Sequence, residues 1–294
     1  MRSDARNKPK PRFRLWIVMI LFAILILTAT IFYYDSNTRL VTNEYELLYP
    51  NLPEAFDGYR IAVLSDIHGA EFGRNNEQLV KKVSDAHPDI IAITGDLIDR
   101  YNTPPIERQL EIADMLISDL VNIAPVYFIT GNHDWDSGEL HRIEGMLNGH
   151  GATVLRNQYT LLEKGSQSVI LAGTDDPNGP ADMITPDVFI DQIRESQGDG
   201  FLVVLEHRNG NLPLYSELGV DLLICGHAHG GIIRLPFTDG LIGPKRKLFP
   251  THTSGVYSML ETNMVVSRGL GSPLGWMRLF NNPHIPVVIL RVDR

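Results

Sequence analysis

The chain has 294 residues, of which 44% are hydrophobic, so it is long enough to bury a substantial core in one large domain or two small ones. Its formal net charge is −9, and its single cysteine, Cys225, excludes an intramolecular disulfide. The first 34 residues carry six basic residues and one acid, which leaves about −14 on residues 35–294. We expect no nucleic-acid binding from such an acidic body.

The chain begins with a basic tail and an apolar segment. Residues 15–34 form an uncharged run of 20 residues, which is long enough to cross a bilayer as a helix. The run ends in four bulky residues rather than at a small-residue cleavage site, which favours an uncleaved anchor over a signal peptide. Six basic residues precede the run and Arg39 follows it, so we expect a cell-membrane protein with residues 1–14 cytoplasmic and its body extracytoplasmic. Tyr33 and Tyr34 would lie at the outer interface.

After a connector and first strand within residues 35–58, strand patterns alternate with helix patterns. The strand patterns cover residues 60–66, 89–96, 125–132, 168–176, 201–207 and 220–227, and the helix patterns cover residues 75–87, 104–122, 137–149 and a segment that begins at Thr185 and Pro186. This alternation predicts βαβ units and an α/β domain over residues 59–294. We interpret two short apolar segments near the end, 264–269 and 286–292, as antiparallel strands that complete the same domain.

Polar side chains follow five of the predicted strands at their carboxyl ends. They are Asp66 and His68, then Asp96 and Asp99, then Asn132, His133 and Asp134, then His207, and finally His227 and His229. Ligands bind outside the carboxyl ends of the strands in α/β sheets, so these residues predict one shared site. A helix N-cap or an Asx turn would explain the polar side chains after any one strand. Independent caps or turns would have no reason to place such side chains after five strands. The histidines without this context, His141, His150, His252 and His284, are interpreted as surface or structural residues.

The chemistry of these side chains predicts a metal site. Nitrogen and oxygen donors without thiolate suit Mn, Fe, Zn, Ni or Co, whereas so many imidazoles disfavour Ca²⁺ or Mg²⁺. Seven donors exceed what one tetrahedral ion needs, so we expect two divalent transition-metal ions that share a carboxylate. Two ions about 3.5–4 Å apart can clamp the attacking and leaving oxygens in phosphoryl transfer.

The motifs SDIHG, GDLID, GNHD, LEHR and CGHAHGG, in this order within residues 59 to about 235, resemble those of the calcineurin-like metallophosphoesterases. Later segments, including VVSRGLG and a late NNP, resemble the membrane-anchored bacterial branch of that family. The resemblance implies an α/β fold of the four-layer αββα sandwich type after one transmembrane helix. It also implies hydrolysis of a phosphodiester or pyrophosphate bond by a metal-bridging hydroxide, with a lipid-linked or envelope ester among the substrates that would suit an anchored enzyme.

The same resemblance implies a role for each site residue. The first metal ion would be held by Asp66, His68 and His229, the second by Asn132, His207 and His227, and both by a bridging Asp96. His133 would be a catalytic non-ligand histidine that protonates the leaving oxygen, and Asp134 would orient it or raise its pKa. Asp99 would hold a ligand in position.

Specificity is expected from loops, because no cap domain interrupts the motifs. Arg74, Arg208 and the basic residues 245–247 are candidate phosphate contacts, with a solvated basic surface as the alternative. Residues 270–280 could form an apolar lip at the membrane, with an ordinary core strand and loop as the alternative. Two alternative functions also stay open: a non-catalytic metal-binding scaffold of the same fold, and a phosphomonoesterase or protein phosphatase.

Overall fold

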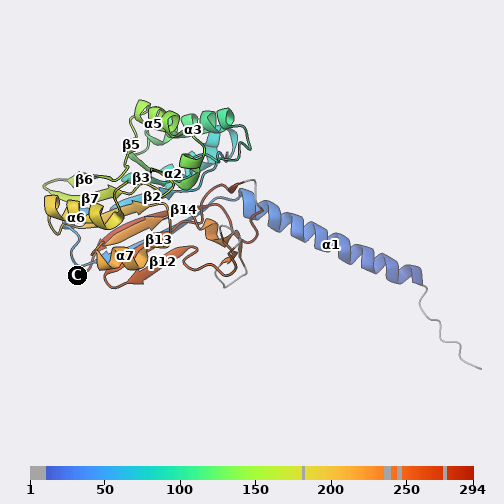
Figure 1. Cartoon of the computed structure of the whole chain (residues 1–294). Helices are drawn as coiled ribbons and strands as arrows, with labels where there is room; N and C mark the ends of the chain where they lie inside the picture. The colour runs from blue at the N-terminus through green and yellow to red at the C-terminus, as the bar shows by residue number, and fades with distance from the viewer. Residues whose placement is uncertain (1–10, 181–182, 235–239, 244–246, 274–276) are drawn as a thin grey trace, which may run out of the picture.

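The computed structural model describes residues 11–180, 183–234, 240–243, 247–273 and 277–294. A long N-terminal helix, α1 (Pro11–Thr38), projects from a domain built on two six-stranded sheets (Figure 1). The α/β architecture predicted from the alternating segments is confirmed.

The first sheet has the strand order β1-β14-β2-β3-β4-β5. Its strands are β1 (Val41–Tyr49), β14 (His284–Val292), β2 (Arg60–Leu64), β3 (Ile90–Thr94), β4 (Val126–Ile129) and β5 (Thr153–Val154). Strands β2 to β5 are parallel, while β14 runs antiparallel to β2 and parallel to β1. The predicted connector therefore supplies the edge strand of this sheet, paired with the last strand of the chain.

The second sheet has the order β12-β13-β9-β8-β7-β6. Its strands are β12 (Gly255–Met259), β13 (Thr262–Val266), β9 (Leu222–Cys225), β8 (Leu202–Glu206), β7 (Gln167–Gly173) and β6 (Gln158–Lys164). Strands β7, β8, β9 and β13 are parallel, and the outer strands β6 and β12 are antiparallel to their neighbours. A separate two-stranded ribbon joins β10 (Ile233–Arg234) to β11 (Gly240–Ile242).

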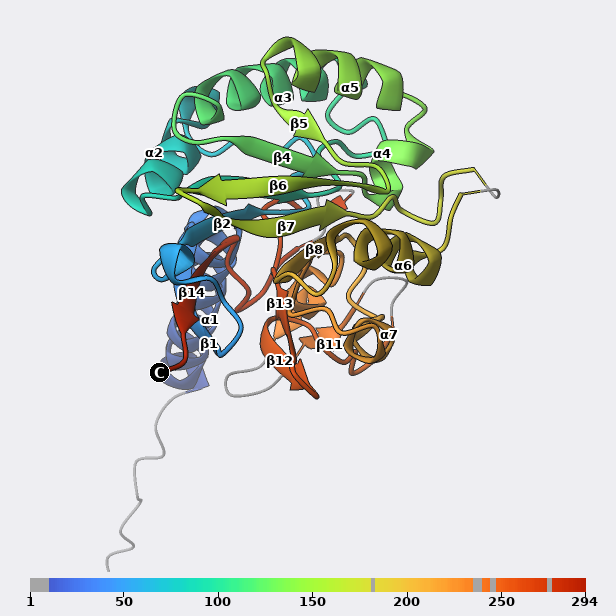
Figure 2. The same cartoon turned by 90° about the vertical axis from the view of Figure 1, so that its left-hand side faces the viewer.

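Helices cover the outer face of each sheet, as Figures 1 and 2 show. The first sheet packs against α2 (Glu77–Asp85), α3 (Ile106–Leu120) and α5 (Leu140–Gly149), and the second against α6 (Pro186–Gln197) and α7 (Leu212–Glu217). Short helices are η1 (Glu54–Phe56), η2 (Arg74–Asn76), α4 (Asn132–Asp136) and η3 (His229–Gly231). The layers therefore follow the predicted αββα order.

The core follows from the period-two alternation of buried strands. In β8, Leu202 and Val204 face the α6–α7 layer, whereas Val203 and Leu205 face the space between the sheets. Both faces of such a strand are buried, which explains why the strands are continuous apolar runs in the sequence. The rigid double sheet fixes the strand ends at which the polar side chains lie.

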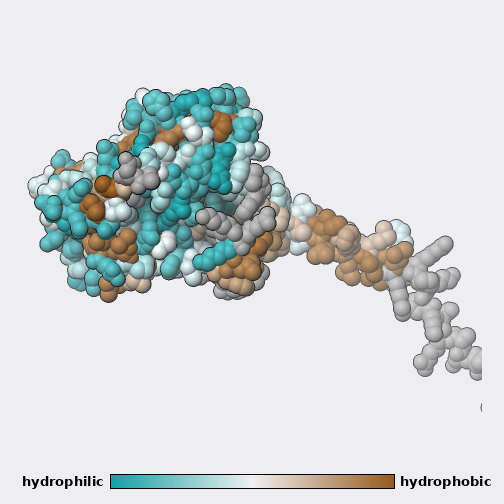
Figure 3. All heavy atoms as spheres, viewed as in Figure 1, coloured by the Kyte–Doolittle hydropathy of each residue, from teal (hydrophilic) through white to brown (hydrophobic). Residues whose placement is uncertain are grey.

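Helix α1 differs from every other helix of the described chain in its surroundings. Within its segment Leu15–Thr38, the most apolar window of 18 residues has a mean hydropathy of 2.8, and none of that window is buried in the domain. Figure 3 shows this helix as a hydrophobic rod beside a largely hydrophilic domain surface. Its length and composition suit a membrane span.

The last turn of α1 is fixed to the domain. The buried Ser36 hydroxyl accepts a hydrogen bond from the Phe280 amide at 2.8 Å, and Asn37 bonds the backbone of Arg278 in both directions at 2.9 and 3.1 Å. The Asn282 side chain donates to the Asp35 carbonyl at 2.7 Å. The helix therefore leaves the domain from a defined foot formed by residues 278–282.

One predicted feature needs correction, and two elements were not predicted. The late segments are only partly antiparallel: β13 runs parallel to β9, and β14 runs parallel to β1, because each is reached by a long crossover. The strand β6 and the short helix α7 had no prediction at all. Both lie at amphipathic or Pro-containing segments whose patterns are too short to stand out.

Candidate metal centre

The predicted site residues lie together where strands of both sheets end. Strands β2, β3 and β4 of the first sheet and β8 and β9 of the second deliver them. Asp66, His68, Asp96, Asn132, His133, Asp134, His207 and His229 are buried, and His227 is partly exposed. The site therefore spans the junction of the two sheets, and the family resemblance implied this position between the sheet edges.

Five of these residues have a left-handed backbone. The φ angles are 50° at Asp66, 49° at His68, 55° at Asp96, 64° at His227 and 47° at His229. Non-glycine residues rarely adopt this conformation, and each case costs on the order of 1–3 kcal/mol. Strain gathered at the ends of the three strands β2, β3 and β9 indicates that the turns are held for their side-chain directions rather than for stability.

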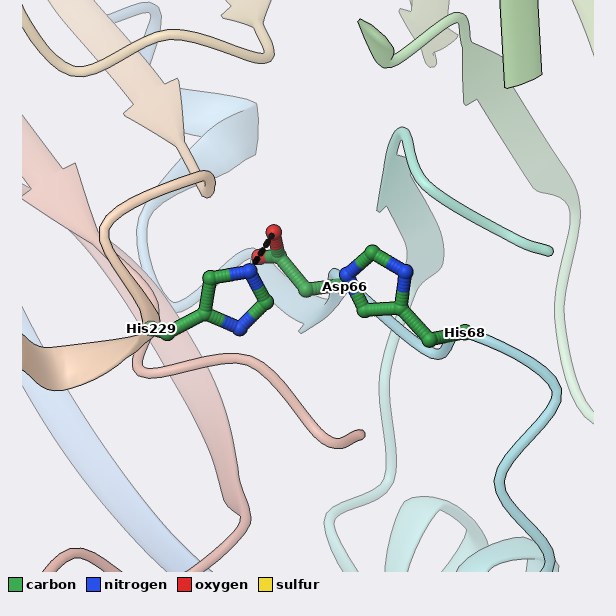
Figure 4. Close-up of side chains that lie close together, drawn as sticks. All are labelled: Asp66, His68 and His229. Atoms are coloured by element: carbon green, nitrogen blue, oxygen red, sulfur yellow. Dashed lines mark ion pairs between the residues drawn. The ribbon is translucent and has the colours of Figure 1, made fainter. Parts of the chain in front are cut away.

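A first cluster contains Asp66, His68 and His229, whose potential ligand atoms lie within 4.8 Å of one another. Figure 4 shows the two imidazoles on either side of the carboxylate, with His229 Nε2 at 3.4 Å from Asp66 Oδ1. Both nitrogens of His68 and Nδ1 of His229 are buried without a hydrogen-bond partner. Such orphaned groups are costly in a native structure, and a metal ion would satisfy them.

A second cluster surrounds His207. Its Nδ1 donates to the Thr94 carbonyl at 2.8 Å, which directs the Nε2 lone pair toward other acceptors. Nε2 lies 3.2 Å from Asn132 Oδ1, 3.2 Å from Asp96 Oδ2 and 3.1 Å from His227 Nδ1. Four acceptor atoms that converge in this way need a proton or a metal ion between them. The donor set therefore fits a cation.

Asp96 lies between the two clusters. Its Oδ2 is 3.2 Å from His207 Nε2 and 3.7 Å from His68 Nε2, while its Oδ1 accepts the His133 amide at 2.7 Å. Asp66 ties the clusters together as well, because its carboxylate accepts the His227 amide at 3.1 Å. The Asp96 carboxylate thus faces ligand atoms of both clusters.

The electrostatics leave the outer imidazoles neutral. Burial lowers the pKa of both His68 and His227 to about 3, so each ring has a lone pair for a metal ion at pH 7. Burial opposes charge on His207 too, but the Asp96 and Asp66 carboxylates outweigh it and raise the pKa of His207 to about 10. The centre of the site is therefore the place where positive charge is most favourable.

The partner of His133 differs from the prediction. His133 Nδ1 lies 2.9 Å from Asp99 Oδ1, both groups being buried, and this contact raises the pKa of His133 against the effect of burial. Asp134 does not orient the His133 ring. It accepts the backbone amides of Asp96, Leu97 and Gly131 at 2.8, 2.9 and 2.8 Å. Asp134 sits in the first turn of α4, where an acidic side chain folds back onto free amides.

Two glycines permit the close approach of the strand ends. A Cβ on Gly131 would lie 2.2 Å from Asp96 Oδ1, and a Cβ on Gly226 would lie 1.8 Å from Ser65 Oγ. Any larger residue would push the candidate ligands apart. The glycines of the GNHD and GHAH motifs are thus part of the geometry of the site.

The predicted phosphate contacts differ from one another in their surroundings. Arg208 is committed to a bidentate pair with Asp176 at 2.8 and 2.9 Å, so it is not a free phosphate ligand. Arg74 lies in η2 with an exposed side chain. Lys245 and Arg246 lie outside the described residues, and Lys247 is exposed.

Three buried polar residues near the site were missed by the sequence reasoning. The Gln109 amide group donates to the Asp99 carbonyl at 3.1 Å, and Asn281 donates to the His229 carbonyl at 2.7 Å. Arg278 is 2% exposed and donates to the Arg268 and Gly271 carbonyls. Only Asn281 had a signal, since it opens the NNP segment. Gln109 and Arg278 look like ordinary surface residues in the sequence.

A buried cluster of imidazoles and carboxylates at the strand ends of a two-sheet α/β sandwich is typical of a protein that binds divalent transition metals. The chain belongs to the calcineurin-like phosphoesterase family, whose model matches residues 59–231. This confirms the resemblance found in the motifs. The protein is therefore a phosphoester hydrolase by family, with candidate metal-ligand clusters in the expected place.

Relatives cover most of the chain at moderate identity. The metallophosphoesterase YkuE of Bacillus subtilis is 28% identical over 253 residues, which is 85% of each protein. The phosphodiesterase YaeI of Escherichia coli is 26% identical over 244 residues, 79% of this chain and 82% of YaeI. A transmembrane protein with a metallophosphoesterase domain from Danio rerio is 28% identical over 259 residues, 84% of this chain and 56% of that protein.

Proposed function

We propose that this protein is a membrane-anchored phosphodiesterase that works with two divalent transition-metal ions. The observation that carries the proposal is the convergence of potential ligand atoms: His207 Nε2 lies within 3.2 Å of three other ligand atoms, and the buried nitrogens of His68 have no hydrogen-bond partner. In this proposal Asp66, His68 and His229 hold one ion, Asn132, His207 and His227 hold the other, and Asp96 contacts both. The ions would polarise the phosphoryl group and activate water for attack.

The remaining chemistry falls to His133. Its Nδ1 is held by the Asp99 carboxylate at 2.9 Å, which fixes the ring and favours the imidazolium form. We propose that His133 delivers its Nε2 proton to the leaving oxygen, so that the alcohol departs neutral. Asp134 supports this step indirectly, since it braces the backbone of Asp96 and Gly131.

A diester is the preferred substrate in this proposal, supported by the relative named phosphodiesterase YaeI. Anchoring in a membrane is supported by the long, exposed and apolar helix α1. It is also supported by the Danio rerio relative, which is named as a transmembrane protein. The excess of basic residues before α1 favours a cytoplasmic N-terminus and an extracytoplasmic catalytic domain.

One panel of substrates tests the function. Full-length protein loaded with Mn²⁺ or Zn²⁺ is assayed on bis(p-nitrophenyl) phosphate, p-nitrophenyl phosphate, a phosphopeptide and a lipid pyrophosphate. The proposal expects the highest kcat/KM on a diester or the pyrophosphate. Preference for the monoester or the phosphopeptide would favour a phosphatase, and failure on all four would favour the scaffold alternative.

A further inference from the structure

A cleft runs from the foot of α1 to the candidate metal centre. It has a volume of about 780 Å³ and is lined at one end by Tyr33 and Tyr34 of α1 and at the other by His68. Its volume lies within the range of about 300–1,000 Å³ that is typical of small-molecule sites. Since His68 belongs to the first ligand cluster, the cleft is continuous with the site described above.

The walls of the cleft are mixed in character. Ala70, Phe72 and Pro104 supply apolar surface to the cleft, and Gln78 of α2 lines it as well. The outer end lies against the final turns of a helix whose large side chains are otherwise exposed: Tyr33 is 47% and Tyr34 is 68% exposed. Aromatic residues at the end of an apolar helix are typical of a membrane–water interface.

Positive charge lies in the cleft, which Glu71 also lines while paired with Arg108 at 2.9 Å. The buried Arg278 lines it, its Nε has no hydrogen-bond partner, and no described Asp or Glu forms an ion pair with it. The guanidinium donates to the Arg268 and Gly271 carbonyls, and the nearby Asp66 carboxylate favours its charge. A buried guanidinium without a direct ion pair is still costly, and an approaching anion would offset that cost. A phosphate group in the cleft would be such an anion.

The domain surface beside the foot of α1 is apolar. Phe280 packs on Phe32 of α1, with ring centroids 5.1 Å apart, and Met277 is 47% exposed nearby in the sequence. These residues belong to the predicted apolar lip, of which residues 274–276 lie outside the described part of the chain. Leu279, which precedes Phe280, pairs with Ile233, and Ile233 pairs with Ile242. Ile242 pairs in turn with Leu248, so the exposed Leu248 and Phe249 lie toward the foot of α1 as well.

We propose that the substrate is a membrane amphiphile: its phosphate ester reaches His68 and Arg278, while its hydrocarbon chain lies along the cleft toward the bilayer at Tyr33 and Tyr34. This inference rests on the proposed phosphodiesterase function, and it adds the substrate class and its route of entry. A fixed helix foot suits this route, because the bonds to Ser36 and Asn37 hold the mouth of the cleft at the membrane surface.

Two esters with the same reacting bond test the inference. Methyl p-nitrophenyl phosphate is soluble, and hexadecyl p-nitrophenyl phosphate is embedded in phosphatidylcholine vesicles that also carry the metal-loaded full-length protein. In both, water adds to phosphorus and p-nitrophenol leaves, so only the alkyl chain differs. The measured quantity is the ratio of kcat/KM for the hexadecyl ester to kcat/KM for the methyl ester.

The ratio is compared in a matched pair of variants on α2. Gln78→Trp fills the cleft, whereas Ser84→Trp places the same side chain at an exposed position of the same helix outside it. Placing the protein and the hexadecyl ester in the same vesicles raises the ratio of kcat/KM equally for the wild type and for both variants. A difference in this ratio between the two variants therefore reports the effect of the cleft alone. We expect Gln78→Trp to lower the ratio by at least about fivefold and Ser84→Trp to stay within about twofold of wild type.

An equal ratio in the two variants would overturn the inference, even if both esters are hydrolysed and the proposed function stands. If neither ester is hydrolysed by the wild-type protein, the proposed function fails and the inference falls with it. A second readout needs no variant: a hexadecyl phosphodiester with a diazirine at the chain end should label residues 33–39 or 70–78. Labelling confined to residues 15–32 would contradict a chain lying in the cleft.

Discussion

Replacing Asp99 by Asn tests the assignment of His133 as the proton donor. The change keeps the shape of the side chain and removes the charge that lies 2.9 Å from His133 Nδ1. A hydrogen bond to a charged group is worth about 1.5–3 kcal/mol and a neutral one about 0.5–1.5 kcal/mol. The difference of about 1.5 kcal/mol would weaken the imidazolium and lower kcat about tenfold. Metal content should not change, because Asp99 contributes to neither cluster of candidate ligands.

The assay compares two leaving groups. A proton donor matters more when the departing oxygen is basic, so the loss should be larger for methyl phenyl phosphate than for methyl p-nitrophenyl phosphate. Asp134→Asn is the control: it should lower the free energy of unfolding by about 1–3 kcal/mol, since Asn keeps only one of the two oxygens that accept the backbone amides, without steepening the dependence on the leaving group. The reasoning is refuted if Asp99→Asn slows both esters equally, or if its activity falls in step with its metal content.

Three further predictions concern the ligands, the backbone and the topology. Asp96→Asn should lose metal and activity together, whereas His133→Ala should keep its metal, measured by elemental analysis, and lose turnover; equal metal loss would remove the separate role of His133. Gly131→Ala should lower the free energy of unfolding by about 1–3 kcal/mol in denaturant titrations, because its Cβ would lie 2.2 Å from Asp96 Oδ1, while Gly145→Ala, which meets nothing within 4 Å, should not. Protease added to intact cells should digest the catalytic domain, and full protection of residues 35–294 would reverse the proposed orientation of α1.

The repeated features of the fold were accessible from the sequence. The continuous apolar run of residues 89–96 predicted β3, because a strand that is buried on both faces is apolar throughout. The amphipathic pattern of residues 104–122 predicted α3, because a helix that is buried on one face is apolar on that face alone. The same strands ended in Asp, His or Asn, which is why the site residues could be grouped before their geometry was known. The pairing of β1 with β14 could not be predicted in this way, since no local pattern specifies which distant strand an edge strand meets.

The side-chain partners inside the site were less accessible. Asp134 follows His133 directly and was therefore expected to orient it, but neighbours on a helix point in different directions, and the contact belongs to Asp99, 34 positions away. Arg278 gave no signal either, because most arginines lie on the surface and a single arginine in the sequence therefore gives no sign of burial. Both facts depend on how loops from separate strands meet.

The central claim is that seven residues from five strands hold two metal ions. Anomalous diffraction from crystals of the protein soaked in Mn²⁺ tests it most directly. The account predicts two anomalous peaks about 3.5–4 Å apart, one bounded by Asp66, His68 and His229 and the other by Asn132, His207 and His227, with Asp96 touching both. A single peak, or peaks away from these residues, would contradict it.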